Sequence, residues 1–315
     1  MTEISDYEFG ISAIDSGYHR PRFDAIYLVV EGDRAVIVDS GVNASVPRVL
    51  AALRAKNLAP EQVDYVMLTH VHLDHAGGAG ALMAHLPNAR LTVHPRGARH
   101  IADPAQLVAG ATAVYGAERM RALYGDIMPV PRARVVETPH GFSLDLNGRK
   151  FVFFDTPGHA RHHVCVLDAQ SGHVFAGDTF GLSLRELDSG GRQFVFPTTT
   201  PVQFDPEALH RSVDLIAGLR PDAVYVTHYG RVDDIPRLAA DMHRLIDAHA
   251  QLALTVRDTG PERHQRLKTG VARLLIEEKQ RQNWTLQREK VLEIFAGDIE
   301  LNAQGLGVWL DAARS

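Results

Sequence analysis

The chain has little of what several classes of protein require. It contains a single cysteine, Cys165, among 315 residues, so it cannot form an internal disulfide. Because Cys165 lies in the apolar run 164–167, we expect it to be buried and unreactive. No apolar run approaches the roughly 18 residues that a bilayer-spanning helix needs, and the N-terminus lacks a basic-then-apolar signal pattern. We therefore expect a cytoplasmic protein that does not enter a membrane.

The chain also lacks an excess of positive charge. Its net charge is −5, from 33 basic and 38 acidic residues, which argues against a general nucleic-acid binder. The hydrophobic content of 45% and the charged content of 23% are typical of a globular protein. The length suggests one large domain, or one domain with an appendage. We expect a small-molecule substrate as the main partner and leave homodimerisation open.

Histidine, by contrast, is abundant, and three of the 17 histidines lie in one short segment. His70, His72, Asp74 and His75 directly follow the apolar run 66–68. Imidazole nitrogen and carboxylate oxygen are ligands that Zn²⁺ and Fe²⁺ prefer. On an extended segment His70 and His72 point the same way, whereas Asp74 and His75 fall where a helix is expected to start. This loop can therefore provide ligands to two adjacent metal sites.

The order of hydrophobic patterns predicts an α/β (α+β) protein. Short strands are expected at 26–30, 35–38, 63–68, 89–93, 151–154, 164–167, 173–176 and 223–226, and helices at 47–56, 79–86 and 206–219. Segment 97–128 has an irregular helical pattern typical of an insertion. Two halves of strand-then-helix order predict an αββα two-sheet sandwich with outer helices.

The character of the chain changes after residue 230. Leu238, Met242, Leu245 and Ile246 follow helical spacing, and a second such group lies at 267–275. A shorter third group lies at 291–295. We therefore predict a catalytic domain over 1–232 and an all-helical C-terminal appendage over 233–315, which caps the site or dimerises.

Three further motifs place a potential ligand just after a predicted strand. They are the segments 155–159, 177–179 and 227–230, which contain His159, Asp178 and His228. Loops at strand ends are where rigid scaffolds hold functional side chains. Each motif alone is a weak signal, but their occurrence together with the cluster at 70–75 is a strong one.

These motifs together resemble the metallo-β-lactamase-fold superfamily over roughly residues 8–232. The pattern His70-x-His72-x-Asp74-His75 matches its signature, the three later residues match its later ligands in order, and Asp39-Ser40-Gly41 is similar to its early aspartate motif. The resemblance implies two divalent metal ions, with zinc favoured and iron or manganese as alternatives. It assigns His70, His72 and His159 to the first metal, Asp74, His75 and His228 to the second, and Asp178 to both as a bridge.

The resemblance implies a binuclear metallo-hydrolase. Two cations about 3.5–4 Å apart can hold a bridging hydroxide and polarise a carbonyl or phosphoryl oxygen. We expect Asp74 to bind metal and to orient that metal-bound hydroxide as the catalytic residue. Asp39 is expected either to accept the N–H of a ligand histidine or simply to cap a turn. The substrate would be a small ester, thioester, lactone or phosphodiester.

The sequence says less about the substrate. Phe180, Phe196 and Tyr229 are expected to line an apolar pocket or to belong to the core. Asp178, where antibiotic-hydrolysing relatives often have Cys, argues against β-lactams, and the absence of Tyr from 179–182 argues against one type of lactonase. Hydroxyacylglutathione hydrolases share the ligand set, but no glutathione-binding pattern is recognised. Two alternatives remain: a mono-iron persulfide-dioxygenase-like oxidoreductase, and a regulatory protein of this fold that acts through a protein partner.

Overall fold

The computed structural model describes residues 3–257 and 260–312, and the chain forms two compact units that alternate along the sequence. The first unit comprises the chain up to residue 155 together with 162–177 and 223–231. The second comprises 156–161, 178–222 and the residues from 232 onward. The division into domains at residue 232 stays a prediction.

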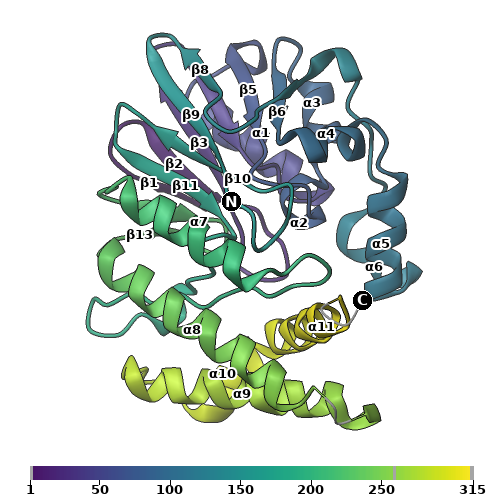
Figure 1. The fold of residues 1–315 in the computed structure, drawn as a ribbon. Helices are drawn as coiled ribbons and strands as arrows, with labels where there is room; N and C mark the ends of the chain where they lie inside the picture. The colour runs from purple at the N-terminus through teal and green to yellow at the C-terminus, as the bar shows by residue number, and fades with distance from the viewer. Residues whose placement is uncertain (1–2, 258–259, 313–315) are drawn as a thin grey trace. The chain divides into compact units, whose positions relative to one another are not determined.

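Two β-sheets form the framework of the first unit (Figure 1). The first sheet has the order β1 (Ile4–Asp6), β2 (Ile11–Asp15), β3 (Ala25–Glu31), β4 (Arg34–Val38), β5 (Val63–Met67), β6 (Arg90–Val93) and β7 (Val135–Glu137). The second has the order β13 (Gly230–Val232), β12 (Val224–Val226), β11 (His173–Gly177), β10 (Val164–Asp168), β9 (Arg149–Asp155) and β8 (Ser143–Leu146). The strands from β4 to β7 run parallel, as do β11 and β12, and the pairings among β1–β4 and among β8–β11 are antiparallel.

Large side chains from both sheets fill the space between them. Tyr27 of β3 contacts Tyr225 of β12 with a ring-centroid distance of 5.1 Å, and Phe175 of β11 stacks on Tyr225 at 5.0 Å. The other face of the first sheet is covered by α1 (Val46–Ala55), α3 (Ala79–His85) and α4 (Pro95–Ala102), whose apolar sides share one buried cluster with it. The predicted two-sheet sandwich with outer helices is thus confirmed, and so is the helical region at the C-terminus.

The predicted insertion consists of α4, α5 (Ala105–Tyr115) and α6 (Ala117–Tyr124). Gly116, at a φ of +80°, separates α5 from α6, whereas Gly110 lies inside α5 and does not interrupt it. Met120 and Tyr124 of α6 share a small buried cluster with Tyr18 and with Leu73 of the histidine loop. The insertion therefore packs directly against the loop that carries the candidate ligands.

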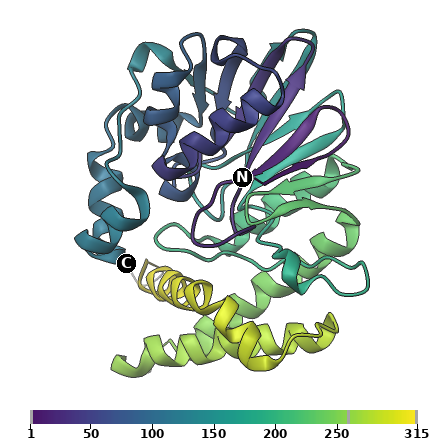
Figure 2. The same ribbon diagram turned by 180° about the vertical axis from the view of Figure 1, so that it is seen from behind.

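Helices make up most of the second unit. They are α7 (Pro206–Gly218), α8 (Ile235–Thr255), α9 (Arg263–Arg281), α10 (Arg288–Ile294) and α11 (Ala296–Ala312). Figure 2 shows α8 to α11 from behind, in green to yellow. Leu238, Met242, Leu245 and Ile246 are buried along α8, as their spacing predicts. Among the residues described, no helix is both long and apolar enough to cross a membrane.

Candidate metal centre

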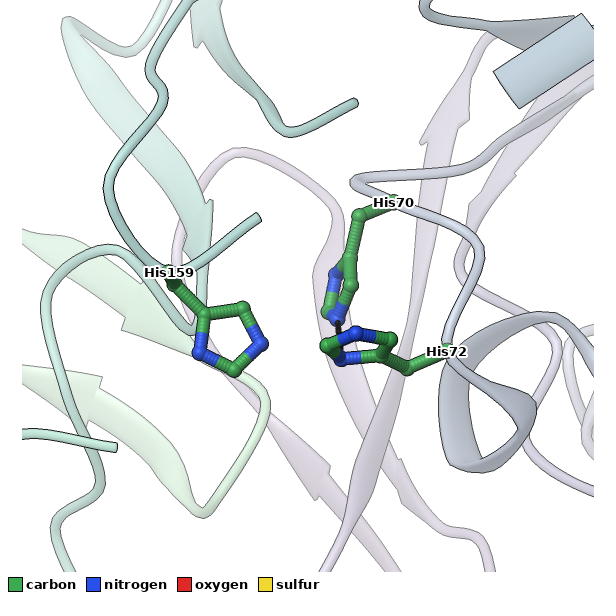
Figure 3. Close-up of side chains that lie close together, drawn as sticks. All are labelled: His70, His72 and His159. Atoms are coloured by element: carbon green, nitrogen blue, oxygen red, sulfur yellow. Dashed lines mark hydrogen bonds between the residues drawn. The ribbon is translucent and has the colours of Figure 1, made fainter. Parts of the chain in front are cut away.

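The histidine loop follows β5 and leads into the short helix α2 (Leu73–Ala76). His72 is the N-cap residue of α2 and has extended backbone angles, so the chain turns at this point. His70 and His75 are fully buried. The Nε2 atom of His70 lies 2.9 Å from the Nδ1 atom of His72 (Figure 3). The loop thus brings one nitrogen of each imidazole within hydrogen-bonding distance of the other, with the two rings nearly perpendicular at 79°.

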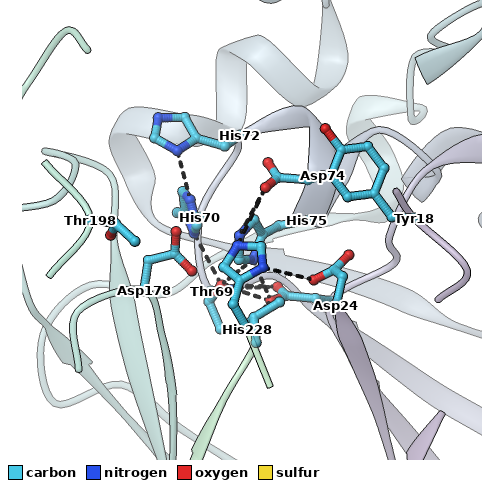
Figure 4. A network of polar contacts seen from close by, with 12 residues as sticks. Tyr18, Asp24, Thr69, His70, His72, Asp74, His75, Asp178, Thr198 and His228 are labelled. Carbon is cyan, nitrogen blue, oxygen red and sulfur yellow. Dashed lines mark hydrogen bonds and ion pairs between the residues drawn. The ribbon is translucent and has the colours of Figure 1, made fainter. Parts of the chain in front are cut away.

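A second group in the same unit joins two strand ends. His228 directly follows Thr227, one residue beyond β12, and its Nε2 lies 3.5 Å from Oδ2 of Asp74. The same oxygen lies 3.8 Å from Nε2 of His75. One potential ligand atom from each of these three residues lies within 4.8 Å of the other two, so the group has the dimensions of a metal site. Figure 4 shows the three side chains pointing toward one another.

Asp39 forms hydrogen bonds with the histidine loop beside this group. It follows β4 with a φ of +61°, a left-handed conformation that is uncommon outside glycine. Its carboxylate accepts hydrogen bonds from Nδ1 of His75 at 2.8 Å, from the backbone N of Thr69 at 2.8 Å and from Oγ1 of Thr227 at 3.2 Å. The Thr69 hydroxyl also donates to it. Asp39 therefore contacts both segments that carry ligand-type histidines, although its role in metal binding stays a prediction.

Sequence reasoning missed a second buried carboxylate, that of Asp24. Its Oδ1 lies 3.7 Å from Nδ1 of His228, and neither oxygen accepts a hydrogen bond from the residues that the structure describes. Burial raises the pKa of Asp24 to about 8, against the opposing effect of the nearby His228 and His75. His228 instead donates its Nδ1 proton to the carbonyl oxygen of Phe23 at 3.2 Å. No sequence motif indicates that Asp24 is functional, because it lies at the end of an irregular segment before β3.

Two tyrosines beside Asp74 were also missed. The hydroxyls of Tyr18 and Tyr124 lie 3.0 Å apart, and their rings stack at 5.9 Å. Burial, followed by the Asp74 carboxylate, raises the pKa of the Tyr18 hydroxyl. The same two causes raise the pKa of Tyr124. Both phenols therefore keep their protons at neutral pH and remain hydrogen-bond donors.

The second unit carries the two remaining predicted ligands. Nε2 of His159 lies 3.5 Å from Oδ2 of Asp178, and both side chains are buried. Nδ1 of His159 contacts Thr198, at 2.9 Å from its hydroxyl and 3.1 Å from its carbonyl oxygen. Gly158 precedes His159 with a φ of +130°, and a Cβ there would lie 2.4 Å from the backbone of Leu209. Only glycine fits that position, which explains the Pro-Gly-His motif.

The three residues predicted to line a substrate pocket are all buried. Phe180 and Phe196 are at most 1% exposed, and Phe196 packs its ring against His249. Tyr229 belongs to the apolar cluster between the sheets. Their role as substrate contacts stays a prediction. His163, four residues after the candidate ligand His159, stacks its ring on that of His70 with a centroid distance of 4.9 Å.

Comparison of the sequence with known protein families identifies the family of this chain. The sequence model described as the metallo-beta-lactamase superfamily matches residues 19–228, which is more than half of the chain and contains every predicted ligand. The protein therefore belongs to the metallo-beta-lactamase superfamily.

Individual relatives are more distant. The chain is 27% identical over 231 residues to a metallo-beta-lactamase fold-containing protein of Sulfurisphaera tokodaii, covering 71% of this chain and 79% of that one. It is 32% identical over 198 residues to a hydroxyacylglutathione hydrolase of Xanthomonas campestris, covering 62% of this chain and only 58% of the enzyme. A metallo-beta-lactamase family protein of Thermus thermophilus superposes with a TM-score of 0.67 at 20% identity, covering 97% and 94% of the two chains. At that identity, the structural match shows a shared fold.

Proposed function

We propose that the protein is a binuclear metal-dependent hydrolase of a small ester, thioester, lactone or phosphodiester. The proposal joins His70, His72, Asp74, His75, His159, Asp178 and His228 into one site for two divalent cations. The observation that carries it is the convergence of Asp74, His75 and His228 from separate strand ends of the first unit. The pair of His159 and Asp178 in the second unit supplies two of the four other proposed ligands.

The hydrogen bonds around the histidines support this use. Nδ1 of His75 faces the Asp39 carboxylate, and Nδ1 of His228 faces the Phe23 carbonyl. Because those oxygens can only accept, each Nδ1 carries the proton and each Nε2 keeps its lone pair. Nδ1 of His159 lies 3.1 Å from the carbonyl oxygen of Thr198, which can accept its proton, and 2.9 Å from the Thr198 hydroxyl, which can donate or accept. A histidine that ligates a metal through one nitrogen characteristically donates its other N–H to such an oxygen.

The donor set suits zinc, iron or manganese, since it consists only of imidazole nitrogens and carboxylate oxygens. When bound, two divalent cations lower the pKa of a coordinated water and polarise the substrate oxygen that gains charge. Asp74 and Asp178 each bring one negative charge and partly neutralise the cations. The net positive charge that remains favours an anionic substrate or transition state.

The remaining roles fall to groups around Asp74. We assign Asp74 to orient the attacking water, because its carboxylate faces His75 and His228 and is partly exposed. Tyr18 and Tyr124 keep their hydroxyl protons beside it and can donate a hydrogen bond to the leaving group. This assignment predicts that Tyr18→Phe lowers kcat more than it raises KM.

Thioesters come first among the substrates to test, since the Xanthomonas campestris hydroxyacylglutathione hydrolase is 32% identical over its matched part.

The decisive experiment combines metal content with activity. Elemental analysis of purified wild type, His72→Ala and Asp178→Ala is followed by assays on ester, thioester, lactone and phosphodiester substrates. We expect about two metal ions per wild-type chain, less metal in both variants and no hydrolysis by either. His264→Gln is the control, because His264 pairs with Glu300 on the helical surface and should leave both readouts unchanged.

Three results would contradict the proposal. Full metal content and full activity in either variant would mean that the assigned residues do not form the site. A single iron ion per chain, with oxygen uptake in place of hydrolysis, would support the oxidoreductase alternative instead. If Asp178→Ala is inactive yet still captures the same protein partner as wild type, a regulatory role would replace the purely enzymatic one.

A further inference from the structure

A second pair of histidines lies within the helical unit, on α7 and α8. His210 and Asp214 are four residues apart on α7, and His243 and Asp247 are four residues apart on α8. Residues at this spacing share one face of a helix. The two helices lie side by side in both views of the unit (Figures 1 and 2). Two identical His-x-x-x-Asp patterns thus face each other across the helix–helix contact.

The four side chains form a continuous chain of contacts. Nε2 of His210 lies 3.0 Å from Oδ1 of Asp247, and Nε2 of His243 lies 3.0 Å from Oδ1 of Asp214. The two Nδ1 atoms lie only 2.6 Å apart, and the rings are nearly parallel, with an interplanar angle of 11°. Each carboxylate therefore fixes the histidine of the other helix, and the arrangement is reciprocal.

This arrangement requires a positive charge between the two facing Nδ1 atoms. An ionised carboxylate only accepts hydrogen bonds, so each Nε2 carries a proton, and in neutral imidazole the Nδ1 atom then has only its lone pair. Two such lone pairs that face each other at 2.6 Å repel unless a positive charge separates them. The two carboxylates also give the cluster a net charge of −2 when both histidines are neutral.

We propose that His210 and His243 bind one late first-row divalent cation, Cu²⁺ or Zn²⁺, through their Nδ1 atoms. Asp214 and Asp247 hold the rings in the ligating orientation, as carboxylates do behind metal-bound histidines. The histidine side chains are 27% and 31% exposed, so water can complete the coordination sphere. Metal–nitrogen bonds of about 2.0–2.1 Å at a tetrahedral angle would place the two nitrogens about 3.3 Å apart, so the side chains, which are partly exposed, must rotate to widen the present distance of 2.6 Å. The bound ion links α7 to α8.

The ion preference follows from the ligands. Imidazole binds divalent first-row metals with affinities that rise toward Cu²⁺ and fall again at Zn²⁺. Hard cations such as Ca²⁺ and Mg²⁺ need a set of oxygen ligands, whereas the two atoms that face each other here are nitrogens. We therefore expect Cu²⁺ to bind more tightly than Zn²⁺, and Mg²⁺ not to compete.

The test uses the full chain with its main centre first saturated with zinc. Cu²⁺ is then titrated into wild type, His243→Gln and His210→Gln, and binding is followed by calorimetry and by electron paramagnetic resonance. Zinc release is measured in parallel, and the copper that replaces zinc in the two glutamine variants is subtracted as exchange at the main centre. We expect wild type to bind one additional Cu²⁺ with nitrogen splitting in the resonance spectrum, and each glutamine variant to lose that ion. Asp214→Asn should keep the stoichiometry but weaken binding about 10- to 100-fold.

The matched control is His264→Gln. His264 is also an exposed histidine with Nε2 paired to a carboxylate, that of Glu300 at 2.9 Å, but no second histidine within the described part of the chain pairs with it. Its replacement should leave the additional Cu²⁺ in place. The proposal is overturned if His243→Gln and His210→Gln bind as much Cu²⁺ as wild type does. It is also overturned if wild type binds none and the pair holds only a shared proton. Neither result bears on hydrolysis, so this test is independent of the proposed function.

Discussion

Asp39→Asn is the change that most directly tests how the metal centre is held in place. Asparagine has nearly the same shape, and its carbonyl oxygen can still accept from the backbone N of Thr69. Its amide NH₂ group, however, takes the place of the oxygen that accepts from Nδ1 of His75. Two donors then face each other, and His75 either loses this bond or moves its proton to Nε2. In the second case Nε2 can no longer bind a metal.

The size of the effect follows from this contact. A hydrogen bond to a charged group contributes about 1.5–3 kcal/mol. Loss of the carboxylate behind a ligating histidine typically costs about 10- to 100-fold in metal affinity, which corresponds to about 1.4–2.7 kcal/mol. Because the two ranges agree, we expect zinc affinity to fall by about that factor, and the free energy of unfolding of the metal-free protein to fall by a similar amount.

Competition with a chelator at pH 7 measures the zinc affinity, and urea denaturation of the metal-free protein measures stability. The matched control is Asp168→Asn, which removes another buried carboxylate of the same unit, one that pairs with Arg149. This variant should lose stability but keep its zinc affinity. The reasoning is refuted if Asp39→Asn binds zinc as tightly as Asp168→Asn does while both are destabilised, since Asp39 would then only support the fold.

Three other predictions concern stability. Burial opposes the charge of Asp168, but hydrogen bonds from Arg149 hold the pKa of this carboxyl below its usual range. We therefore expect Asp168→Asn to lower the free energy of unfolding by about 3–5 kcal/mol at pH 7. Urea midpoints should show the difference between wild type and variant shrinking as the pH falls below about 4, where Asp168 becomes protonated. Burial lowers the pKa of His249 to about 4, so about 3 kcal/mol of the free energy of unfolding should be lost as the pH falls from about 6.5 to 4. His249→Leu should remove this loss. If the stability of His249→Leu falls with pH as that of wild type does, His249 is not its cause. A Cβ at Gly177 would lie 2.8 Å from Cβ of Thr69 at a φ of +49°, so Gly177→Ala should cost about 2–5 kcal/mol in urea denaturation, and a cost below about 1 kcal/mol would show that the turn relaxes.

The sequence could predict the ligand-type residues because each one is encoded locally. His70 and His75 belong to one loop, and His159, Asp178 and His228 each follow a recognisable apolar strand, so short-range patterns were enough to find them. The prediction that these residues form one two-metal site rests on the family resemblance and not on spacing. Spacing within a segment says nothing about which strand ends lie together.

The residues that support the ligands could not be predicted in the same way. Asp24 and Tyr124 approach the ligand residues only through tertiary folding, and each is an ordinary polar residue in its own segment. Helix α11 lies in the segment that was predicted to be all-helical, but no apolar spacing beyond 291–295 marked it as a separate helix. Gly305 interrupts its pattern because the backbone of Thr199 packs against it so closely that a Cβ would lie 1.5 Å from the Thr199 carbonyl oxygen. A residue chosen for close approach therefore looks, in the sequence, like a residue that ends a helix.

The hydrogen bonds behind the histidines also show that separate segments orient the candidate ligands. The acceptors behind His75, His228 and His159 are Asp39, the Phe23 carbonyl and the Thr198 carbonyl. Each acceptor lies in a different loop from the histidine that it fixes, so no ring orientation is set by its own segment alone. Each Nε2 lone pair is consequently aimed by the packing of the sandwich and of the second unit. A substitution that removes or moves one of these acceptors should therefore weaken metal binding even where no ligand is changed, whereas an equally destabilising change elsewhere in the fold should not.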